Sequence, residues 1–506
     1  MGEPSRRALA RMGVAAPWLA LIVGSLLLAP WGTGAGAGGQ ASLDPAAVDA
    51  FIARQMRAAR VPGLALAITR GEEVLYVRGY GLARAGEPVT PETQFLVGSL
   101  SKSFTALAVM QLVEAGRIDL DAPVQAYLPE FTLADPDAAS RITVRHLLNQ
   151  TSGLADAGYP PMRPPHPATP AERVADLARA RPVAAPGVEY HYHNVNYEIL
   201  ARLVEVVGGQ EFSAYLAEHV FSPLGMVGTL SILTDEDLGR PERLAQGHLN
   251  LYGVPVADAE EEGFLGGSGG VVTTAADMAR WLMVQANGGR LEGAQVLSSE
   301  GVAAMHTPPE GIETDYAMGW IATTRRGVPV LEHNGILSTF YADMALLPES
   351  GHGIALLYNV QSLAQVGVGF PPIMDGLIDV LTGREPRPPR FTVGALEALF
   401  GALTLVGAVQ AARRLWRLPA WRAWARTVPG WRLAPGIIWA LLPAAFLAAM
   451  PRIVLASSGR AFGYRTLARS MPEVTVWLGL TGALGLVDVA ARLAHLVRRG
   501  RKEEIR

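Results

Sequence analysis

The five residues Gly98-Ser99-Leu100-Ser101-Lys102 say most about the fold of this 506-residue chain. They open a run without glycine or proline, residues 103–112, that is typical of a helix. Ser99 and Lys102 then lie one turn apart on the same face, so the amino group can reach the hydroxyl group. A serine hydroxyl becomes a nucleophile only when a base takes its proton, and lysine is such a base only where its pKa falls below ~10.4. The pattern therefore predicts a nucleophile and its base in an enclosed site, although Ser-x-x-Lys alone also occurs on ordinary surface helices.

Four further segments follow this helix in the chain. In order they are residues 142–154, residues 186–194 with Tyr192-His193-Asn194, residues 266–274 followed by Asp277, and His333-Asn334-Gly335. With Ser99 and Lys102 in front of them, these segments make residues 44–382 resemble the serine β-lactamase and penicillin-binding family. The resemblance is greatest to the class C branch and its related esterases, D-aminopeptidases and D,D-peptidases. No segment is specific alone, whereas the set in this order is.

The resemblance implies roles for particular residues. Ser99 attacks a carbonyl group and forms an acyl-enzyme, while Lys102 and Tyr192 share the role of base, since a phenol beside an ammonium group has a lowered pKa. The backbone N–H groups of Ser99 and Ile336 form the oxyanion hole. Substrate binding is assigned to Asn194, His333, Gly335 and Ile336, and Asn194 also holds Lys102.

The third of these motifs departs from that of the lactamases. His333 stands where they carry a lysine that attracts the substrate carboxylate, and histidine is mostly neutral at pH 7. Asn334 replaces a threonine that binds the same carboxylate. We therefore expect weak β-lactamase activity and predict an ester, amide or D-amino-acid peptide as substrate.

Strand-like runs lie at both ends of residues 44–382, and helical patterns fill the middle. Residues 63–70 and 73–80 predict a hairpin, and helices are predicted at 45–60 and 363–381. Later strands are predicted at residues 318–324, 328–332, 341–347 and 353–359. We predict an α+β fold, a β-lactamase-like antiparallel sheet flanked by helices with a helical insertion, followed by an all-α transmembrane region.

Composition excludes several classes of site. The chain has no cysteine, which excludes disulfides and thiolate catalysis, and its formal net charge of −3 gives no reason to expect a nucleic acid partner. We predict no cofactor and no metal, because His191 and His193 flank Tyr192 without a set of acidic partners. Ser268 is expected to lie in a turn, and residues 260–262, three glutamates, to be a solvated charge run.

The N-terminus predicts a secretory signal. Arg6, Arg7 and Arg11 form its basic region, residues 14–29 its apolar region, and residues 35–37 a small-residue cleavage site. An uncleaved membrane anchor is the alternative, and in both cases the following domain crosses the membrane.

Three apolar stretches, at about residues 393–412, 434–456 and 474–491, each approach the ~20 residues that a helix needs to span a bilayer. The loop 413–432 carries six arginines and no acidic residue, and positively charged loops stay in the cytoplasm. Everything before the first stretch is therefore predicted to lie outside. Core helices of a soluble domain are the alternative, disfavoured because nothing comparable occurs between residues 43 and 385.

The predicted organisation follows from these observations. It comprises a signal peptide (1–37), a linker (38–43), a serine hydrolase domain (44–383), a second linker (384–392), three transmembrane helices (393–495) and a cytoplasmic tail (496–506).

The sequence thus predicts a membrane-anchored extracytoplasmic serine hydrolase that acts through an acyl-enzyme at Ser99. Its expected partners are the membrane and a small-molecule or peptide substrate, such as one derived from the cell wall. The alternative is a sensor of β-lactams or cell-wall fragments, acylated at Ser99 and signalling through the membrane helices. A catalytically dead binding module is disfavoured because the motif set is complete.

Overall fold

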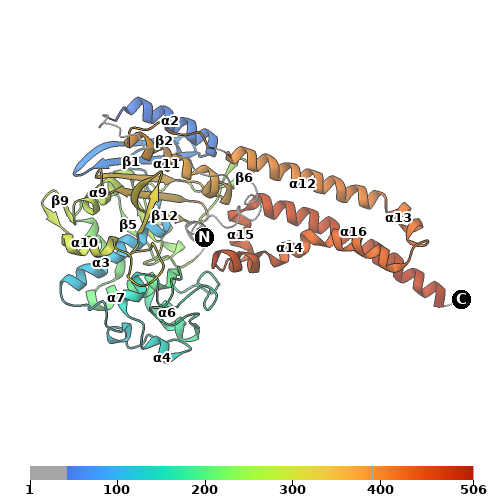
Figure 1. Ribbon diagram of the computed structural model, residues 1–506, viewed down its shortest axis with the longest axis horizontal. Coiled ribbons are helices and arrows are strands. Elements are labelled where there is room, and N and C mark those ends of the chain that lie inside the picture. Colours follow the sequence, from blue (N-terminus) through green and yellow to red (C-terminus); the bar gives the residue numbers. More distant parts are fainter. Residues whose placement is uncertain (1–42, 262, 390, 505–506) are drawn as a thin grey trace, which may run out of the picture.

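The computed structural model describes residues 43–261, 263–389 and 391–504. The predicted signal peptide and its expected cleavage site lie outside the described residues. Within these, a domain of strands and helices is followed by three long helices that project from it together (Figure 1).

A seven-stranded antiparallel sheet forms the centre of the domain, in the order β11-β12-β13-β14-β1-β2-β3. Its strands are β1 (Gly63–Arg70), β2 (Glu73–Arg84), β3 (Glu87–Pro88), β11 (Ile321–Arg325), β12 (Val328–Ile336), β13 (Tyr341–Leu347) and β14 (His352–Tyr358). β1 pairs with β14, which places Leu64 opposite Tyr358. The prediction of one sheet completed by the N- and C-terminal segments, with β1 and β2 as a hairpin, is therefore confirmed.

Helices cover both faces of this sheet. They include α2 (Pro45–Ala59) and α11 (Pro371–Leu381) on one face, and α3 (Ser101–Glu114) and α9 (Ala275–Ala286) on the other. The central strand β1 is buried, and successive side chains of a strand point to opposite faces. Leu64 and Leu66 therefore pack in the core beneath α2 and α11, while Ala65 and Ala67 pack in the core beneath α3 and α9. The α+β architecture is that expected from the sequence.

The helical insertion lies between β3 and β11. Its longer elements are α4 (Pro136–Ala139), α5 (Val144–Leu148), α6 (Pro170–Asp176), α7 (Asn194–Gly208), α8 (Phe212–Leu216) and α10 (Ser299–His306). Its strands are β4 (Phe95–Leu96), β5 (Leu230–Ser231), β6 (His248–Leu251), β7 (Val254–Ala257), β8 (Val271–Thr273), β9 (Arg290–Leu291) and β10 (Ala294–Gln295). Short helical turns complete it at η2 (Gly98–Leu100), η3 (Val124–Ala126), η4 (Leu177–Arg179), η5 (Ala217–Phe221) and η6 (Asp235–Gly239).

The single helix predicted at residues 363–381 is interrupted. A π-helical turn, η7 (Gln365–Gly369), precedes α11, which begins at Pro371. Pro371 and Pro372 have no backbone N–H group to continue the hydrogen-bond ladder, so a new helix starts there with proline in its first turn. The helix predicted at residues 45–60 is confirmed as α2, whose first turn is capped by the Asp44 carboxylate accepting from the N–H of Ala46 at 2.9 Å.

Three helices after residue 392 are long and apolar enough to cross a membrane, over Val393–Trp416, Gly430–Ser458 and Pro472–Arg498. They are α12 (Val393–Trp416), α14 (Ala434–Ser458) and α16 (Pro472–Glu504), joined by α13 (Leu418–Ala425), η8 (Gly430–Leu433) and α15 (Tyr464–Ser470). Large apolar side chains such as Leu405, Trp439 and Phe446 are exposed on them. Because water disfavours such a surface and lipid accommodates it, this exposure indicates membrane association.

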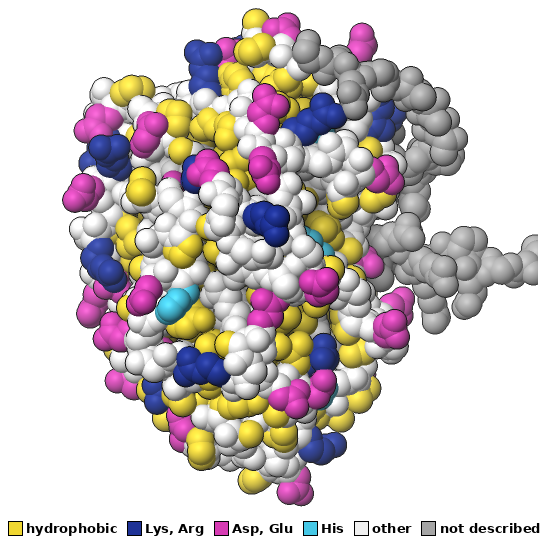
Figure 2. Space-filling view, turned by 90° about the vertical axis from the view of Figure 1, so that its left-hand side faces the viewer, with side chains coloured by type: hydrophobic (Ala, Val, Ile, Leu, Met, Phe, Trp, Pro, Cys, Tyr) yellow, Lys and Arg dark blue, Asp and Glu magenta, His cyan; other side chains and the backbone are white. Residues whose placement is uncertain are grey.

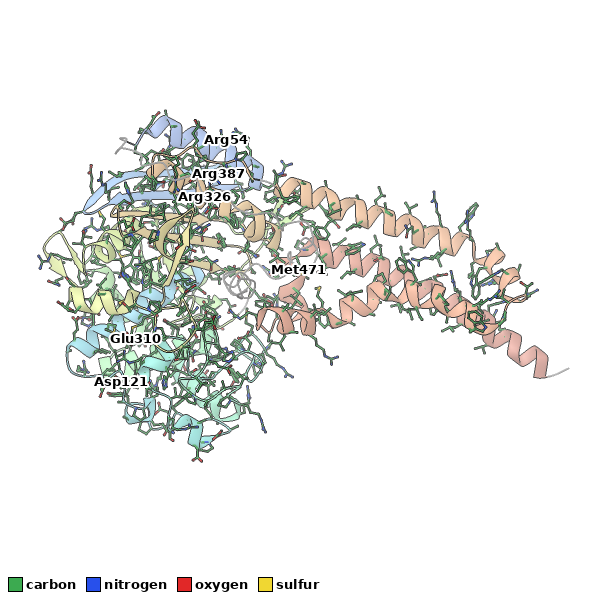
Figure 3. The ribbon with its side chains drawn as sticks, viewed as in Figure 1. Arg54, Asp121, Glu310, Arg326, Arg387 and Met471 are labelled. Atoms are coloured by element: carbon green, nitrogen blue, oxygen red, sulfur yellow. The ribbon has the colours of Figure 1, made fainter. Side chains whose placement is uncertain are left out.

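The face of the domain turned away from the three long helices is mixed in character. Figure 2 shows basic and acidic side chains scattered over this face among apolar ones. Figure 3 places Met471 at the opposite side, where the domain meets the helices. The part of the molecule that adjoins the predicted membrane is therefore the side that carries Met471.

Candidate active site

Ser99 lies at the junction of a strand and a helix. It is the middle residue of η2, between β4 and α3, and Gly98 before it has a φ of 51°, in the left-handed region that favours glycine. Gly335 on β12 packs against the same turn: a Cβ atom there would lie 1.8 Å from the carbonyl oxygen of Val97. Two glycines therefore allow the nucleophile turn and β12 to approach each other at backbone distance.

This approach brings the expected oxyanion donors near each other. A Cβ atom on Gly98 would lie 3.1 Å from the Ile336 nitrogen, and one on Gly335 would lie 3.1 Å from the Ser99 nitrogen. The backbone nitrogens of Ser99 and Ile336 thus line one small space, and both residues border the same cavity. Such a pair of N–H groups can stabilise a developing oxyanion.

Lys102 makes three polar contacts in a fully buried position. Its Nζ lies 2.9 Å from Ser99 Oγ, 3.0 Å from Asn194 Oδ1 and 2.8 Å from the carbonyl oxygen of Ser268. Burial, together with the positive charge of Arg460, lowers the pKa of Lys102 well below its usual value. The one-turn geometry expected from the Ser-x-x-Lys spacing is therefore present.

The contacts of Lys102 also define the proton arrangement. A neutral amine has two N–H groups and one lone pair, and the oxygens of Asn194 and Ser268 can only accept hydrogen bonds. When both N–H groups are donated to these oxygens, the lone pair is left for the third contact, the hydroxyl group of Ser99. Neutral Lys102 is thus oriented to take the Ser99 proton.

Tyr192 contacts Ser99 from the other side. Its hydroxyl group donates a hydrogen bond to Ser99 Oγ at 2.8 Å. The lowered pKa that the sequence led us to expect is wrong: burial raises the pKa of Tyr192 to about 12, although Arg460 and the bond to Ser99 act in the opposite direction. Tyr192 is therefore arranged as a proton donor in the free protein, and Lys102 is the better base.

His333 is a neutral group with a fixed tautomer. Its Nδ1 lies 2.7 Å from the carbonyl oxygen of Asn334 and must donate to it, which leaves Nε2 as a hydrogen-bond acceptor. Burial, together with the positive charge that Lys102 carries when protonated, lowers the pKa of His333 to about 3. Among the described residues, Nε2 has no hydrogen-bond partner. A lone pair at this position repels a carboxylate and suits a substrate N–H or O–H group.

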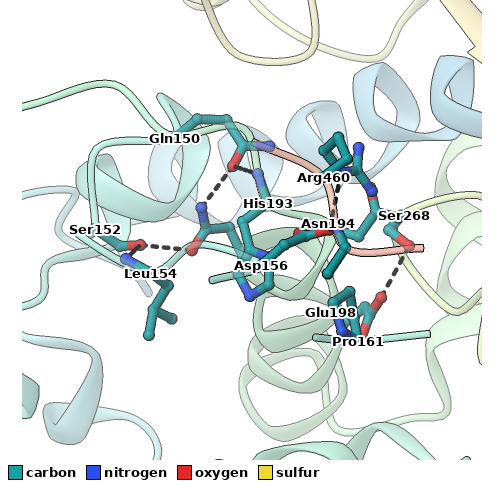
Figure 4. A network of polar contacts seen from close by, with 12 residues as sticks. Gln150, Ser152, Leu154, Asp156, Pro161, His193, Asn194, Glu198, Ser268 and Arg460 are labelled. Carbon is teal, nitrogen blue, oxygen red and sulfur yellow. Dashed lines mark hydrogen bonds and ion pairs between the residues drawn. The ribbon is translucent and has the colours of Figure 1, made fainter. Parts of the chain in front are cut away.

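One part of the site was missed by the sequence analysis: a buried ion pair behind Tyr192. Asp156 Oδ1 lies 2.9 Å from His193 Nδ1, while its Oδ2 lies 3.1 Å from Arg460 Nε and accepts from the N–H of Ala461 at 2.8 Å. Although burial opposes it, the charge of Arg460 and the bond to His193 lower the pKa of Asp156 to about 2. Figure 4 shows Asp156, His193 and Arg460 in one network.

Arg460 comes from the chain between two of the long helices. Its guanidinium carbon lies 5.3 Å from the centre of the Tyr192 ring, a cation–π distance. Residues 459–471, which join α14 to α16 and are called the connecting segment below, thus reach the residues around Ser99. No motif marked Arg460, and the sequence did not indicate that His193 is buried against Asp156.

Ser268 contributes through its backbone, in agreement with its expected place in a turn. Its carbonyl oxygen accepts from Lys102, and its hydroxyl group donates to Glu198 Oε1 at 3.1 Å. Glu198 is paired in turn with the buried Arg173 at 2.5 Å. A buried ion pair therefore holds the loop that orients Lys102.

The run of glutamates at 260–262 was interpreted wrongly in part. Glu260 and Glu261 are half-buried, and Glu260 accepts hydrogen bonds from the backbone and side chains of Ser338 and Thr339. Glu261 accepts from Thr466 at 3.0 Å. Both side chains fix the wall of the site, whereas residue 262 lies outside the described residues.

A cavity of about 190 Å³ contains the Ser99 site. The domain contributes Ser99, Tyr192, Asn194, His333, Asn334 and Ile336 to its lining. The C-terminal region contributes Val454, Ser458, Arg460, Phe462, Leu467 and Met471. Of the site residues expected from the sequence, Lys102 on α3 and Gly335 on β12 lie beside this cavity and the others line it, while the C-terminal region adds a further wall.

Comparison with known proteins agrees with this geometry. The Beta-lactamase family model matches residues 48–369. Penicillin-binding protein 4 of Amycolatopsis lactamdurans is 32% identical over 59% of this chain and 81% of its own length. Unguisins hydrolase ungD' of Aspergillus campestris is 27% identical over 59% of this chain and 58% of its own. The octameric penicillin-binding protein homologue from Pyrococcus abyssi superposes with a TM-score of 0.56 at 27% identity, covering 68% of this chain and 78% of that one. This chain belongs to the Beta-lactamase family of serine β-lactamases and penicillin-binding proteins, a family of serine hydrolases.

Proposed function

We propose that this protein is a membrane-anchored, extracytoplasmic serine hydrolase that cleaves an ester, amide or D-amino-acid peptide through an acyl-enzyme at Ser99. The observation that carries the proposal is the position of Lys102 Nζ, 2.9 Å from Ser99 Oγ and bound to two fixed acceptors. A relative named as a hydrolase of unguisins supports hydrolysis rather than binding alone.

The reaction follows from these contacts. Lys102 Nζ takes the Ser99 proton while Oγ bonds to the substrate carbonyl carbon, and the N–H groups of Ser99 and Ile336 hold the oxyanion. The tetrahedral intermediate then expels its leaving group, which takes a proton from the Tyr192 hydroxyl group; the Lys102 ammonium group replaces that proton and becomes neutral again. A water molecule attacks the resulting ester and gives a proton to Lys102. Lys102 returns this proton to Ser99 Oγ as the bond between Oγ and the carbonyl carbon breaks, and the acid product leaves.

Substrate profiling tests this function. The full-length protein in detergent is offered p-nitrophenyl esters, D-Ala-D-Ala peptides and a chromogenic cephalosporin. Continuous product release from an ester or a peptide supports a hydrolase. Absence of turnover and of covalent labelling at Ser99 by any of these compounds or by a fluorophosphonate would overturn the proposal.

A sensor is the second candidate, favoured by one observation. Arg460 of the connecting segment contacts the ring of Tyr192, so acylation at Ser99 has a direct structural route to α14. A sensor releases product only once, in an amount equal to that of the protein, whereas a hydrolase continues. The same assay therefore separates the two functions.

The third motif predicts the substrate preference. Neutral His333, with a lone pair at Nε2, cannot bind a carboxylate, so esters or D-amino-acid peptides should be cleaved faster than a cephalosporin. Changing His333→Lys together with Asn334→Thr adds donors worth roughly 1.5–3 kcal/mol each to a carboxylate. We expect the ratio of kcat/KM for cephalosporin to that for ester to rise at least ~10-fold. An unmodified protein that already prefers the cephalosporin would contradict this interpretation of the motif.

The membrane orientation gives a further prediction. The arginine-rich loop 413–432 should lie in the cytoplasm and residues 44–385 outside it. Reporter enzymes that are active only outside the cytoplasm should therefore work when fused after residue 385 and fail after residue 425. The reverse pattern would show that the orientation is inverted.

A further inference from the structure

The Ser99 cavity continues from the domain towards the long helices. Its lining combines Ser99, Tyr192 and Asn194 of the domain with Val454, Leu467 and Met471 of the C-terminal region. The last three residues belong to an apolar cluster of the C-terminal region, which also holds Met450 and Leu478. The site thus combines polar residues around Ser99 with an apolar part, called the apolar end below, that is built by Val454 of α14, Leu467 of α15 and Met471.

The apolar end lies where the membrane is expected to begin. α14 has 25 residues, which at 1.5 Å per residue make a helix of ~37 Å, longer than the ~30 Å hydrocarbon core of a bilayer. Its last residue, Ser458, should therefore lie among the lipid headgroups. Val454 is one helical turn nearer to the bilayer centre, so the cavity reaches the boundary of the hydrocarbon region.

The connecting segment that forms this wall is fixed to the domain. Arg469 is paired with Asp258 at 2.7 Å, and the hydroxyl group of Thr466 donates to Glu261 at 3.0 Å. The ion pair of Arg460 with Asp156 adds a third, buried connection. The apolar end of the cavity is thus part of the site's own wall, and Figure 3 labels one of its lining residues, Met471, on the side of the domain from which the helices project.

We propose that the substrate is a bilayer amphiphile, an ester or amide whose apolar chain enters between α14 and α15 while its carbonyl group reaches Ser99. This inference rests on the proposed hydrolase activity and orientation. A membrane-dissolved chain already lies at the level of Val454, and burying each of its CH₂ groups against apolar side chains is favourable. A small polar substrate gains nothing from the apolar end of this cavity.

The test compares two fluorogenic esters that share one leaving group. The full-length protein is reconstituted in lipid vesicles and offered 4-methylumbelliferyl butanoate, which is water-soluble, or the hexadecanoate, incorporated in the bilayer. We expect the hexadecanoate to have the higher kcat/KM. We also expect hexadecanoate placed in the vesicles that contain the protein to be cleaved at least ~10-fold faster than hexadecanoate placed in separate, protein-free vesicles that are then mixed with them. Equal rates in the two kinds of vesicle, or preference for the butanoate, would overturn the inference while leaving the hydrolase function supported.

A substitution at the apolar end of the cavity gives a second, independent test of the substrate preference. Val454→Phe fills the apolar end, and we expect it to lower the hexadecanoate-to-butanoate ratio of kcat/KM at least ~10-fold. The matched control is Ile453→Phe on the neighbouring residue, which is exposed and does not line the cavity, and which should keep the ratio of the unmodified protein. An unchanged ratio in Val454→Phe would contradict the inference. Loss of both activities in the unmodified protein, with no labelling of Ser99, would instead overturn the proposed function and the inference with it.

Discussion

Replacing Ser99 with alanine is expected to abolish hydrolysis of every substrate and labelling by a fluorophosphonate. The Ser99 hydroxyl group is the one nucleophilic atom between Lys102 Nζ and the Tyr192 hydroxyl group, at 2.9 and 2.8 Å. Because a nucleophile and its base act as a unit, removing a serine nucleophile lowers kcat by roughly 10⁵- to 10⁶-fold. The change removes one oxygen atom from a helix start and leaves the packed core intact.

The measurement is kcat on a p-nitrophenyl ester with labelling followed by mass spectrometry. Ser140→Ala is the control, since Ser140 is exposed on the far side of the insertion and should keep full activity. Thermal unfolding of both variants shows that they are folded. Undiminished turnover by Ser99→Ala would remove Ser99 from the mechanism, whereas labelling at another serine would relocate the nucleophile.

Replacing Arg460 with glutamine is expected to move the acidic limb of the kcat/KM profile to higher pH. The base must be unprotonated to act, and the positive charge of Arg460 lowers the pKa values of both Lys102 and Tyr192. Without this charge both pKa values rise, so at a given pH on the acidic side of the profile a smaller fraction of the protein has its base unprotonated. A unit charge ~5 Å away acts with ~3 kcal/mol at an effective dielectric constant near 20, which corresponds to a shift of about two pH units.

Two further variants separate electrostatics from folding. Arg460→Lys keeps the charge and should return the limb towards its original pH. Arg460→Gln alone leaves the buried Asp156 carboxylate without its cationic partner, and breaking a buried ion pair in this way destabilises a protein by ~3–5 kcal/mol. The double variant with Asp156→Asn avoids this cost because it removes both charges together. Arg452→Gln, an exposed arginine on α14, is the matched control and should change neither the profile nor stability. An unchanged acidic limb in a folded Arg460→Gln protein would exclude the electrostatic role.

Much of the fold and part of the site could be predicted because they depend on local patterns. The spacing of Ser99 and Lys102 places them on one helical face, and the alternation along 63–70 and 73–80 marks the hairpin β1–β2. The long apolar runs after residue 392 predict helices of spanning length for the same reason, since one residue adds a fixed rise. Such features are set by neighbours within a few residues of one another.

The sequence by itself therefore determined the order of the main elements, the pairing of Ser99 with Lys102 that we propose as nucleophile and base, and three helices of membrane-spanning length. Only the tertiary structure decided how these residues are charged and what encloses them. Asp156 and Arg460 are 304 residues apart, and no spacing rule relates them until packing brings the connecting segment against the domain. Burial depends on all the segments that surround a residue. It raises the pKa of Tyr192 to about 12 and lowers the pKa of Lys102, and no local sequence pattern shows it. For the same reason the apolar wall at Val454 becomes part of the active site only after the chain has folded.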